Sequence, residues 1–268
     1  MNLAERPMRS LLVMGRLTLG RVAHTWKVFL SLAIGLVIWE IVGHNTTRLV
    51  FAPFSDTFVA FLDAMASGEL VRHTAVSLTE LAIGFVIGSS IGLAGGVLAA
   101  LNKSFRDITD PWVSILYSTP YVAVIPIFII WFGLGMSSKV ALVVLAVFIP
   151  VWLNTWLGVT GTDPHLVEVM RTFGATRRQI LKWVVLPWAL PSFMMGIRLA
   201  FSRGFIAVIV GEFLGSSAGV GYFILKSSEF FKTADLLAGM LVLSIIAVLT
   251  VEFLKWIQHR MVPWWEVR

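Results

Sequence analysis

Long runs of apolar residues alternate with short polar connections along this chain. Six of the runs are about 17 to 25 residues long, the length that a helix rising 1.5 Å per residue needs to cross about 30 Å of hydrocarbon. They lie near residues 26–43, 76–101, 113–132, 139–159, 188–212 and 236–257. The pattern predicts an all-α fold, a polytopic membrane helix bundle with about six transmembrane helices.

The composition agrees with a membrane protein. Apolar residues make up 57% of the 268 residues, charged residues only 13%, and the mean hydropathy is +0.86. An ordinary soluble domain is roughly 45 to 50% apolar and about 25% charged. A core cannot hide the excess apolar surface from water, so the composition excludes a soluble globular enzyme and makes lipid a partner of the chain.

The net charge of +6 is a topology signal in such a chain, and no nucleic-acid partner is expected. With the N-terminus inside, fourteen Lys and Arg fall on the cytoplasmic side of the six spans and five on the outer side. Because cytoplasmic loops are enriched in Lys and Arg, we expect both the N- and the C-terminus in the cytoplasm.

The first residues form a separate segment in this interpretation. We expect 1–25 to be a cytoplasmic amphipathic segment and 26–268 to be one transmembrane domain. Within 7–25, Leu and Val positions oppose Arg9, Arg16 and Arg21, so a helix can lie along the headgroups, although a simple positive topology anchor fits equally well. No n-region, h-region and cleavage-site pattern of a signal peptide is evident.

Four glycines in the second span recur every fourth residue: Gly84, Gly88, Gly92 and Gly96. A face of small residues lets another helix approach to backbone distance, so these positions are predicted to pack against a neighbouring helix. The alternative, a phosphate-binding loop, fails because no G-x-x-x-x-G-K-[ST] pattern occurs.

The sequence offers no apparatus for catalysis. Cysteine is absent, the five histidines are scattered over loops and span ends, and the hydroxyls in the spans have no base beside them. We therefore expect no catalytic residue, no metal site and no cofactor bound by this chain.

Ionisable residues within spans are more informative, because each costs a few kcal/mol at the bilayer centre and tends to face a bundle interior or an aqueous path. Glu40, Glu80, Arg198 and Glu252 are near enough to span ends to reach the interface. Arg203 is the deepest. Glu212 follows nine residues later, about two and a half turns on, and we take the two to share a similar face, as part of an anion path or as a structural charge pair.

Prolines and one connection modify the helix pattern. Pro120, Pro126 and Pro150 fall within the third and fourth spans and predict bends, since each removes a backbone donor. The connection 213–235 is too apolar for a plain solvated loop, and we interpret it as a short re-entrant or gate-like segment.

The most specific feature is the connection 160–187. We expect a helix that begins after Asp163 and Pro164, is broken by Gly174, continues through basic residues and stops at Pro187. A short helix pair below the membrane suits a docking surface for a partner.

This connection resembles the EAA loop of permease subunits of ATP-binding-cassette importers, whose pattern is E-A-A, three residues, G, nine residues, I-x-L-P. Four positions stand at the family spacing: Glu168, Gly174, Leu186 and Pro187. Val169 and Met170 replace the two alanines of the pattern, and Val184 replaces its isoleucine. The changes keep the polarity of the loop.

Further motifs over about residues 50–265 resemble the nitrate, sulfonate and taurine branch of these permeases. They are Thr119–Pro126, Trp131–Gly135, Asn154-Thr155 with Gly158, Leu190-Pro191 with Gly196, and Glu212 before Gly219-Val220-Gly221. Their order along the chain makes chance agreement improbable.

The resemblance implies the permease of a type I importer, which dimerises, binds two copies of an ATPase and receives solute from an extracytoplasmic binding protein in a bacterial inner membrane. ATP and magnesium would bind in the ATPase. The residues implied to couple to it are Glu168, Val169, Met170, Gly174, Ala175, Arg177, Leu186 and Pro187. The solute implied is a small organic or inorganic anion such as a sulfonate, taurine or nitrate.

Two other classes of protein fit the sequence less well. An ion-coupled secondary transporter predicts inverted repeats and a relay of buried carboxylates, and neither is apparent in the sequence. An intramembrane enzyme needs a nucleophile with its base, or metal ligands, within the spans. The importer permease is the better reading.

Overall fold

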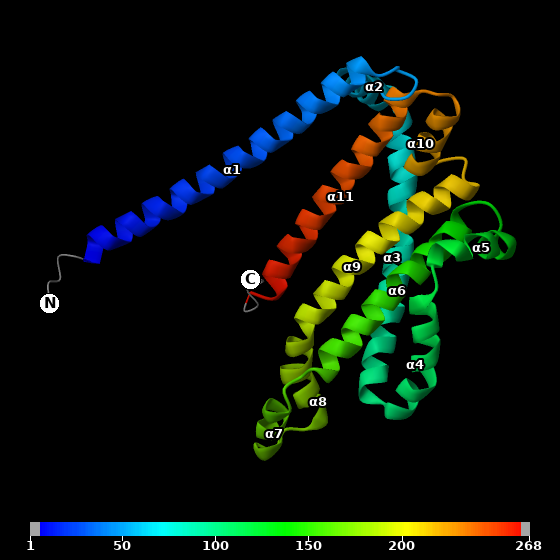
Figure 1. The fold of residues 1–268 in the computed structure, drawn as a ribbon. Coiled ribbons are helices and arrows are strands. Elements are labelled where there is room, and N and C mark those ends of the chain that lie inside the picture. Colours follow the sequence, from blue (N-terminus) through cyan, green and yellow to red (C-terminus); the bar gives the residue numbers. More distant parts are fainter. Residues whose placement is uncertain (1–5, 264–268) are drawn as a thin grey trace.

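The computed structural model describes the backbone of residues 6–263 and the side chains of residues 26–263, and this part of the chain is helical without a β-strand (Figure 1). The helices in chain order are α1 (Arg6–Asn45), α2 (Phe54–Ala66), α3 (Glu69–Leu101), α4 (Lys103–Ser118), η2 (Tyr121–Val124), α5 (Ile125–Phe132), α6 (Met136–Thr160), α7 (Pro164–Thr172), α8 (Arg177–Ile180), η3 (Leu181–Val185), α9 (Leu186–Gly215), α10 (Val220–Glu229) and α11 (Thr233–Met261).

Five of the six predicted spans are single helices that are long and apolar enough to cross a membrane. They are Trp26–Asn45, Glu69–Leu101, Met136–Thr160, Arg177–Gly215 and Thr233–Met261. The expected span 113–132 is not one helix, because α4 and the segment Tyr121–Phe132 meet at an angle of 93°. The helix bundle is confirmed, with the third span broken.

The break in the third span is located at Pro120. Thr119 before it has the extended conformation φ −79°, ψ 130°, which a following proline favours because its ring crowds the helical conformation of the preceding residue. The bend expected at Pro120 is therefore present, whereas neither Pro126 nor Pro150 ends a helix. Pro126 is in the first turn of α5, where a missing N–H is tolerated, and α6 continues through Pro150.

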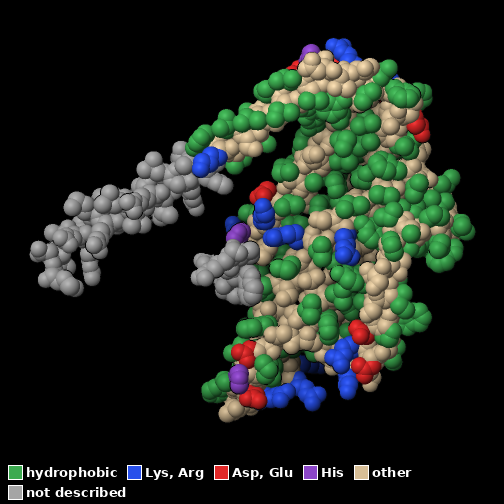
Figure 2. Space-filling model, in the orientation of Figure 1, with side chains coloured by type: hydrophobic (Ala, Val, Ile, Leu, Met, Phe, Trp, Pro, Cys, Tyr) green, Lys and Arg blue, Asp and Glu red, His purple; other side chains and the backbone are tan. Residues whose placement is uncertain are grey.

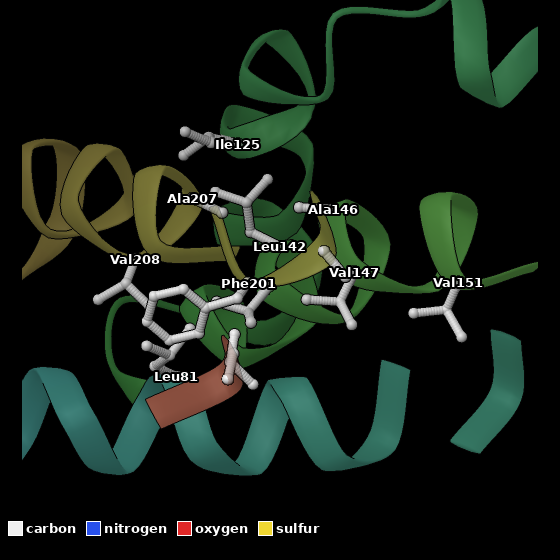
Figure 3. Close-up of a cluster of buried hydrophobic side chains, with 12 residues drawn as sticks. Leu81, Ile125, Leu142, Ala146, Val147, Val151, Phe201, Ala207 and Val208 are labelled. Atoms are coloured by element: carbon white, nitrogen blue, oxygen red, sulfur yellow. The ribbon is translucent and has the colours of Figure 1, made fainter. Parts of the chain in front are cut away.

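The core forms where α6 packs between α3 and α9. Figure 3 shows its buried side chains converging from these helices, with Leu81 from α3, Leu142 and Val147 from α6, and Phe201 from α9. Ile125 joins them from α5. The broken third span is thus attached to the bundle through α5.

The glycine face of α3 lies directly against α6. A Cβ atom added at Gly84 would be 2.5 Å from the Cβ of Val143, and one at Gly92 would be 2.6 Å from the carbonyl oxygen of Phe148. Gly88 and Gly96 make the same kind of approach. The two backbones come so close that only glycine fits between them.

The short elements gather at two opposite ends of the bundle (Figure 1). We call the first the α2/α10 end; it holds α2, α10 and the connection 133–135 between α5 and α6. We call the second the α7/α8 end; it also holds the turn between α3 and α4. Figure 2 shows Lys and Arg side chains clustered at the α7/α8 end, while hydrophobic side chains cover much of the flanks between the ends.

Helix α1 joins the rest of the bundle only near its end at residue 45. Trp39 donates to the carbonyl of Ala52 (3.1 Å), and Glu40 accepts from the hydroxyl of Ser55 (2.7 Å), so Glu40 lies at a span end as expected. The backbone of α1 runs through residue 25 without a break. The amphipathic character predicted for 7–25 lies outside the residues whose side chains are described.

Candidate functional site

The connection 160–187 folds into two short helices with a tight turn between them. Asp163 begins α7 by accepting from the amide of His165 (2.9 Å). At its other end Gly174 has φ +76°, the amide of Gly174 donates to Arg171, and the amide of Ala175 donates to Met170. This is a Schellman motif, in which a glycine in the left-handed region ends a helix. The expected break at Gly174 is therefore present.

The second helix does not stop at Pro187. Thr176 begins α8 in a capping box with Gln179, and the helical run then continues from Arg177 to Gly215. The expectation of an end at Pro187 is wrong because the turn Leu181–Val185 is wound as a π-helix, and the missing amide of the proline falls at this irregular turn.

The surface of this connection exposes large apolar side chains beside its charged ones. Phe173 is 84% exposed and Trp183 is 65% exposed. A groove of about 350 Å³ runs between α7 and the start of α9, lined by Val169, Met170 and Pro187 together with Leu166, Trp183, Val184 and Trp188. Exposed aromatic groups around a groove are typical of a protein interface.

The predicted coupling residues are distributed over this surface. Glu168, Val169, Gly174, Arg177 and Leu186 are exposed, and Met170, Ala175 and Pro187 are half-buried. The indole of Trp188 donates to the carbonyl of Gly161 (2.8 Å), which ties the start of α9 to the α6–α7 connection. The helix pair is thus joined to two membrane helices.

A buried polar network lies at the α2/α10 end, centred on Glu212 of α9, which is fully buried. Its carboxylate accepts from the hydroxyl of Ser77 (2.6 Å) and from the amide of Gly221 (2.6 Å). The amide of Val220 donates to Ser77 (2.8 Å), and the amide of Gly219 donates to Nδ1 of His73 (3.0 Å). The amides of Gly219, Val220 and Gly221 at the start of α10 are therefore satisfied by side chains of α3 and α9.

A second part of this network joins α3 to α6. Glu80 and Lys139 form an ion pair, with side chains that are 1% and 6% exposed, and Lys139 also donates to the hydroxyl of Ser216 (2.9 Å). Glu80 was expected to reach the interface from a span end. That expectation is wrong, because its carboxylate is held inside the bundle by the lysine.

Sequence reasoning missed Ser77, His73 and Lys139 as members of this network. From its position in the sequence, Lys139 is one of the five Lys and Arg residues assigned to the outer side of the membrane. The signal in the sequence is the presence of Glu80 and Glu212 within apolar spans. A buried carboxylate needs a cation or several donors, so these two residues indicate that such partners exist. Nothing in the spacing along the chain identifies which donors they are.

Arg203 and Glu212 do not share a face of α9, and the expectation that they do is wrong. Two and a half turns of helix put two side chains on opposite sides. Arg203 is half-buried beside α4, with its guanidinium carbon 5.4 Å from the ring centre of Tyr117, whereas Glu212 points toward α3 and α10. In the described part of the chain, Arg203 forms no ion pair.

The remaining ionisable residues of the spans have local partners. Arg198 donates to the side chain of Gln258, and Glu252 pairs with Lys255 on the exposed surface (2.6 Å). Within residues 26–263, no three His, Cys, Asp or Glu side chains gather in a group that could hold a metal ion.

These features define a class of protein: a multi-pass helical membrane protein with a polar network inside its bundle and an apolar groove beside a helix pair at one end. Residues 88–267 match the family described as Binding-protein-dependent transport system inner membrane component, and the chain belongs to this family.

Several relatives match over most of their length. The chain is 35% identical over 248 residues to a Bacillus subtilis (strain 168) protein named as an aliphatic sulfonates transport permease, with 91% of this chain and 90% of the relative covered. It is 31% identical over 243 residues to the taurine transport system permease protein of Escherichia coli (strain K12), with 87% and 88% covered. It is 30% identical to the formylaminopyrimidine transport permease protein of Halalkalibacterium halodurans, with 85% and 92% covered.

Solved structures share the fold. An inward-facing structure of the MetNI methionine ABC transporter matches with a TM-score of 0.59 at 22% identity, covering 72% of this chain and 94% of that chain. An amino acid ABC transporter crystallised with histidines matches with a TM-score of 0.58 at 14% identity, covering 76% and 98%.

The protein is therefore a transmembrane permease subunit of an ATP-binding-cassette importer, a translocating subunit and not an enzyme. Membership of the family implies an ATPase and a solute-binding protein as partners. The suggested resemblance to the sulfonate and taurine branch is confirmed by the relatives.

Proposed function

We propose that the chain forms the translocation path for a small anion of the sulfonate class, delivered by an extracytoplasmic binding protein. Two relatives named for aliphatic sulfonates and taurine support this class of solute. The main structural support is Arg203, a half-buried cation within a membrane helix that no described carboxylate neutralises.

The surroundings of Arg203 suit a passing anion. Its guanidinium lies against Tyr117, at the end of α4, one turn before the break at Pro120. Non-helical backbone at membrane depth is tolerated where it lines a cavity, and a charge inside a span usually faces such a cavity. Arg203 and the broken third span together therefore form the candidate contact for the solute. Glu212 takes no part in this contact, since it binds α10.

The helix pair α7 and α8 is the surface proposed to bind the ATPase. One ATPase copy would cover Phe173 and the groove around Met170 and Pro187. A second copy of the permease would bind the second ATPase copy in the same way. The exposed coupling residues Glu168, Val169, Arg177 and Leu186 are placed to contact the same partner, and Gly174 and Ala175 form the turn that presents them. ATP and magnesium would be held by the ATPase.

The bundle is proposed to sit in a bacterial inner membrane with its α7/α8 end and both termini in the cytoplasm. The excess of Lys and Arg on that side supports this orientation. Lipid would cover the apolar flanks, where Ile130, Val86 and Leu249 are among the exposed side chains.

The test of the path is uptake of radiolabelled ethanesulfonate and taurine by cells that express the full transporter with Arg203→Ala. We expect uptake to fall on the order of tenfold or more, because a hydrogen bond to a charged group contributes about 1.5 to 3 kcal/mol. Arg198→Ala, in the same helix but bonded to Gln258, is the matched control and should change uptake much less. Normal uptake by Arg203→Ala at equal protein level would remove the anion role.

A further inference from the structure

Helices α4 and α9 approach each other through the side chains of Tyr117 and Arg203, whose guanidinium carbon lies 5.4 Å from the ring centre. Helix α4 otherwise packs against α3 and α6, for example through the stacked rings of Phe105 and Trp152, whose centres are 6.0 Å apart. Tyr117 is 51% exposed, so its ring is not part of a core. The contact with Arg203 is therefore not a by-product of core packing.

A ring is an unusual partner for a cation inside a membrane span. Ionisable side chains in spans usually pair with one another or with backbone carbonyls. In the described part of the chain, no carboxylate lies within ion-pair distance of Arg203. An aromatic ring attracts a cation through its quadrupole and carries no net charge. Tyr117 thus holds the guanidinium without neutralising it, whereas a carboxylate in the same place would cancel the charge.

The residues next to this pair are open on the side of the break in the third span. Thr119 and Pro120 are exposed, and Tyr121 is half-buried where η2 packs against α9. The hydroxyls of Ser118 and Thr119 donate to carbonyls one turn earlier in α4 (2.9 and 2.8 Å). The guanidinium is therefore the charged donor that this break offers to a solute.

We propose that Tyr117 is a positioning residue of the translocation path: its ring holds the Arg203 guanidinium beside the break and leaves the positive charge free for a passing anion. The inference rests on the proposed function, in which Arg203 contacts the solute, and adds the residue that sets where the guanidinium lies. The ring and not its hydroxyl has this role, because the attraction to the cation comes from the π face. Without the ring, the long arginine side chain is free to change rotamer.

The absence of cysteine allows a direct test with a single thiol in the full transporter, purified with its ATPase. Ser114 is exposed and lies three residues before Tyr117, on the same face of α4. Ser114→Cys is treated with sulfonatoethyl methanethiosulfonate, itself an ethanesulfonate, and with the trimethylammonium reagent of the same length. The ratio of the two rates, divided by the ratio for free mercaptoethanol, measures the preference for the anion. We expect a value well above one.

Substitutions in the Ser114→Cys chain then separate the ring from the hydroxyl. Tyr117→Leu should lower the ratio about threefold, the size of an exposed cation–π contact, and Tyr117→Phe should leave it unchanged. Arg203→Gln should remove the preference altogether. Trp112→Leu is the matched control, since it removes a 67% exposed ring of the same helix over which no described cation lies. If Tyr117→Leu fails to fold, Tyr117→Met replaces the ring by an unbranched chain that suits a helix.

Uptake of ethanesulfonate gives a second measurement of the same coupling. Tyr117→Leu should lower uptake at equal protein level in the otherwise native transporter. It should have no further effect in Arg203→Ala, because the ring then has no cation to hold. Effects that add in the double variant would show that the two residues act independently and would overturn the inference.

The outcomes distinguish this inference from the proposed function. An unchanged ratio in Tyr117→Leu, or an equal loss in Tyr117→Phe, overturns the role of the ring, while the loss in Arg203→Gln still supports the path. An unchanged ratio in Arg203→Gln, or a thiol that reacts with neither reagent, removes the proposed anion path itself and the inference with it.

Discussion

Single residues set the geometry of the ATPase surface, and Gly174 does so through its backbone alone. A Cβ atom added there meets nothing within 4 Å, yet its φ of +76° lies in the left-handed region that other residues avoid. The turn between α7 and α8 therefore depends on the conformational freedom of glycine and not on space.

Gly174→Ala is expected to weaken the Schellman turn by about 1 to 2 kcal/mol, the cost of the left-handed conformation for a residue with a Cβ. The ATPase recovered with the affinity-tagged permease from mild detergent should fall several-fold at equal expression. Gly35→Ala is the matched control, since its Cβ also meets nothing within 4 Å but its φ is not positive. Equal recovery from both variants would show that the turn does not shape the docking surface.

The sequence predicted this turn because glycine at a helix end is a local signal. It did not predict the partner of Glu80, because the donor, Lys139, comes from another helix and only the packing of α3 on α6 brings them together. Arg203 and Glu212 were expected to share a face of their helix. Their spacing of two and a half turns instead places them on opposite sides.

Elements are held together by two different devices, close packing and capping. The glycine face of α3 joins it to α6 through van der Waals contact, which is the main source of helix association in lipid. The polar network instead holds α10 by its amide end, where a carboxylate also interacts favourably with the helix dipole.

Adding one methyl group to the glycine face should loosen the bundle. In Gly92→Ala the new Cβ would lie 2.6 Å from the carbonyl of Phe148 and 2.8 Å from the Cβ of Val151, so the helices must separate. Overpacking of this kind costs about 1 to 3 kcal/mol. The thermal unfolding midpoint in detergent should drop, while Ser90→Val, which adds bulk on the exposed side of α3, should leave it nearly unchanged.

Removing the cap of α10 should release that helix without unfolding the bundle. Glu212→Ala leaves the amide of Gly221 without its acceptor and removes the nearer of the two acceptors of the Ser77 hydroxyl, the other being the carbonyl of His73 (3.2 Å). Amide hydrogen exchange over residues 219–224 should accelerate on the order of tenfold, because such a bond contributes about 1.5 to 3 kcal/mol. Glu229→Ala, at the exposed far end of α10, should not change it; the same protection in both variants would contradict the cap.

In the whole molecule, the polar network and the proposed ATPase surface lie at opposite ends, with the membrane spans between them (Figure 1). Hydropathy predicted the spans and their number, since the length of an apolar run is set by the bilayer. The bend predicted at Pro120 is present as the 93° angle in the third span, whereas Pro126 carries the same signal and lies in the first turn of α5, and α6 stays helical through Pro150. The helical run Arg177–Gly215 likewise continues through Pro187.

Orientation is a property of the whole chain and can be read with single cysteines. Ser67→Cys at the α2/α10 end should react with an impermeant maleimide in intact cells, or in spheroplasts where an outer barrier is present. Thr172→Cys at the α7/α8 end should react only after the membrane is permeabilised. The reverse pattern would place the helix pair outside and exclude ATPase docking there.

The ion pair of Glu80 and Lys139 also bears on biosynthesis. Lys139 follows Glu80 by 59 residues, so at about 5 to 20 residues per second the glutamate is made roughly 3 to 12 seconds before its partner. During that time α3 contains an unpaired charge that lipid disfavours by a few kcal/mol. The charge of Glu80 is therefore compensated only after α6 has been made, and α3 gains part of its stability in the bilayer at that later step.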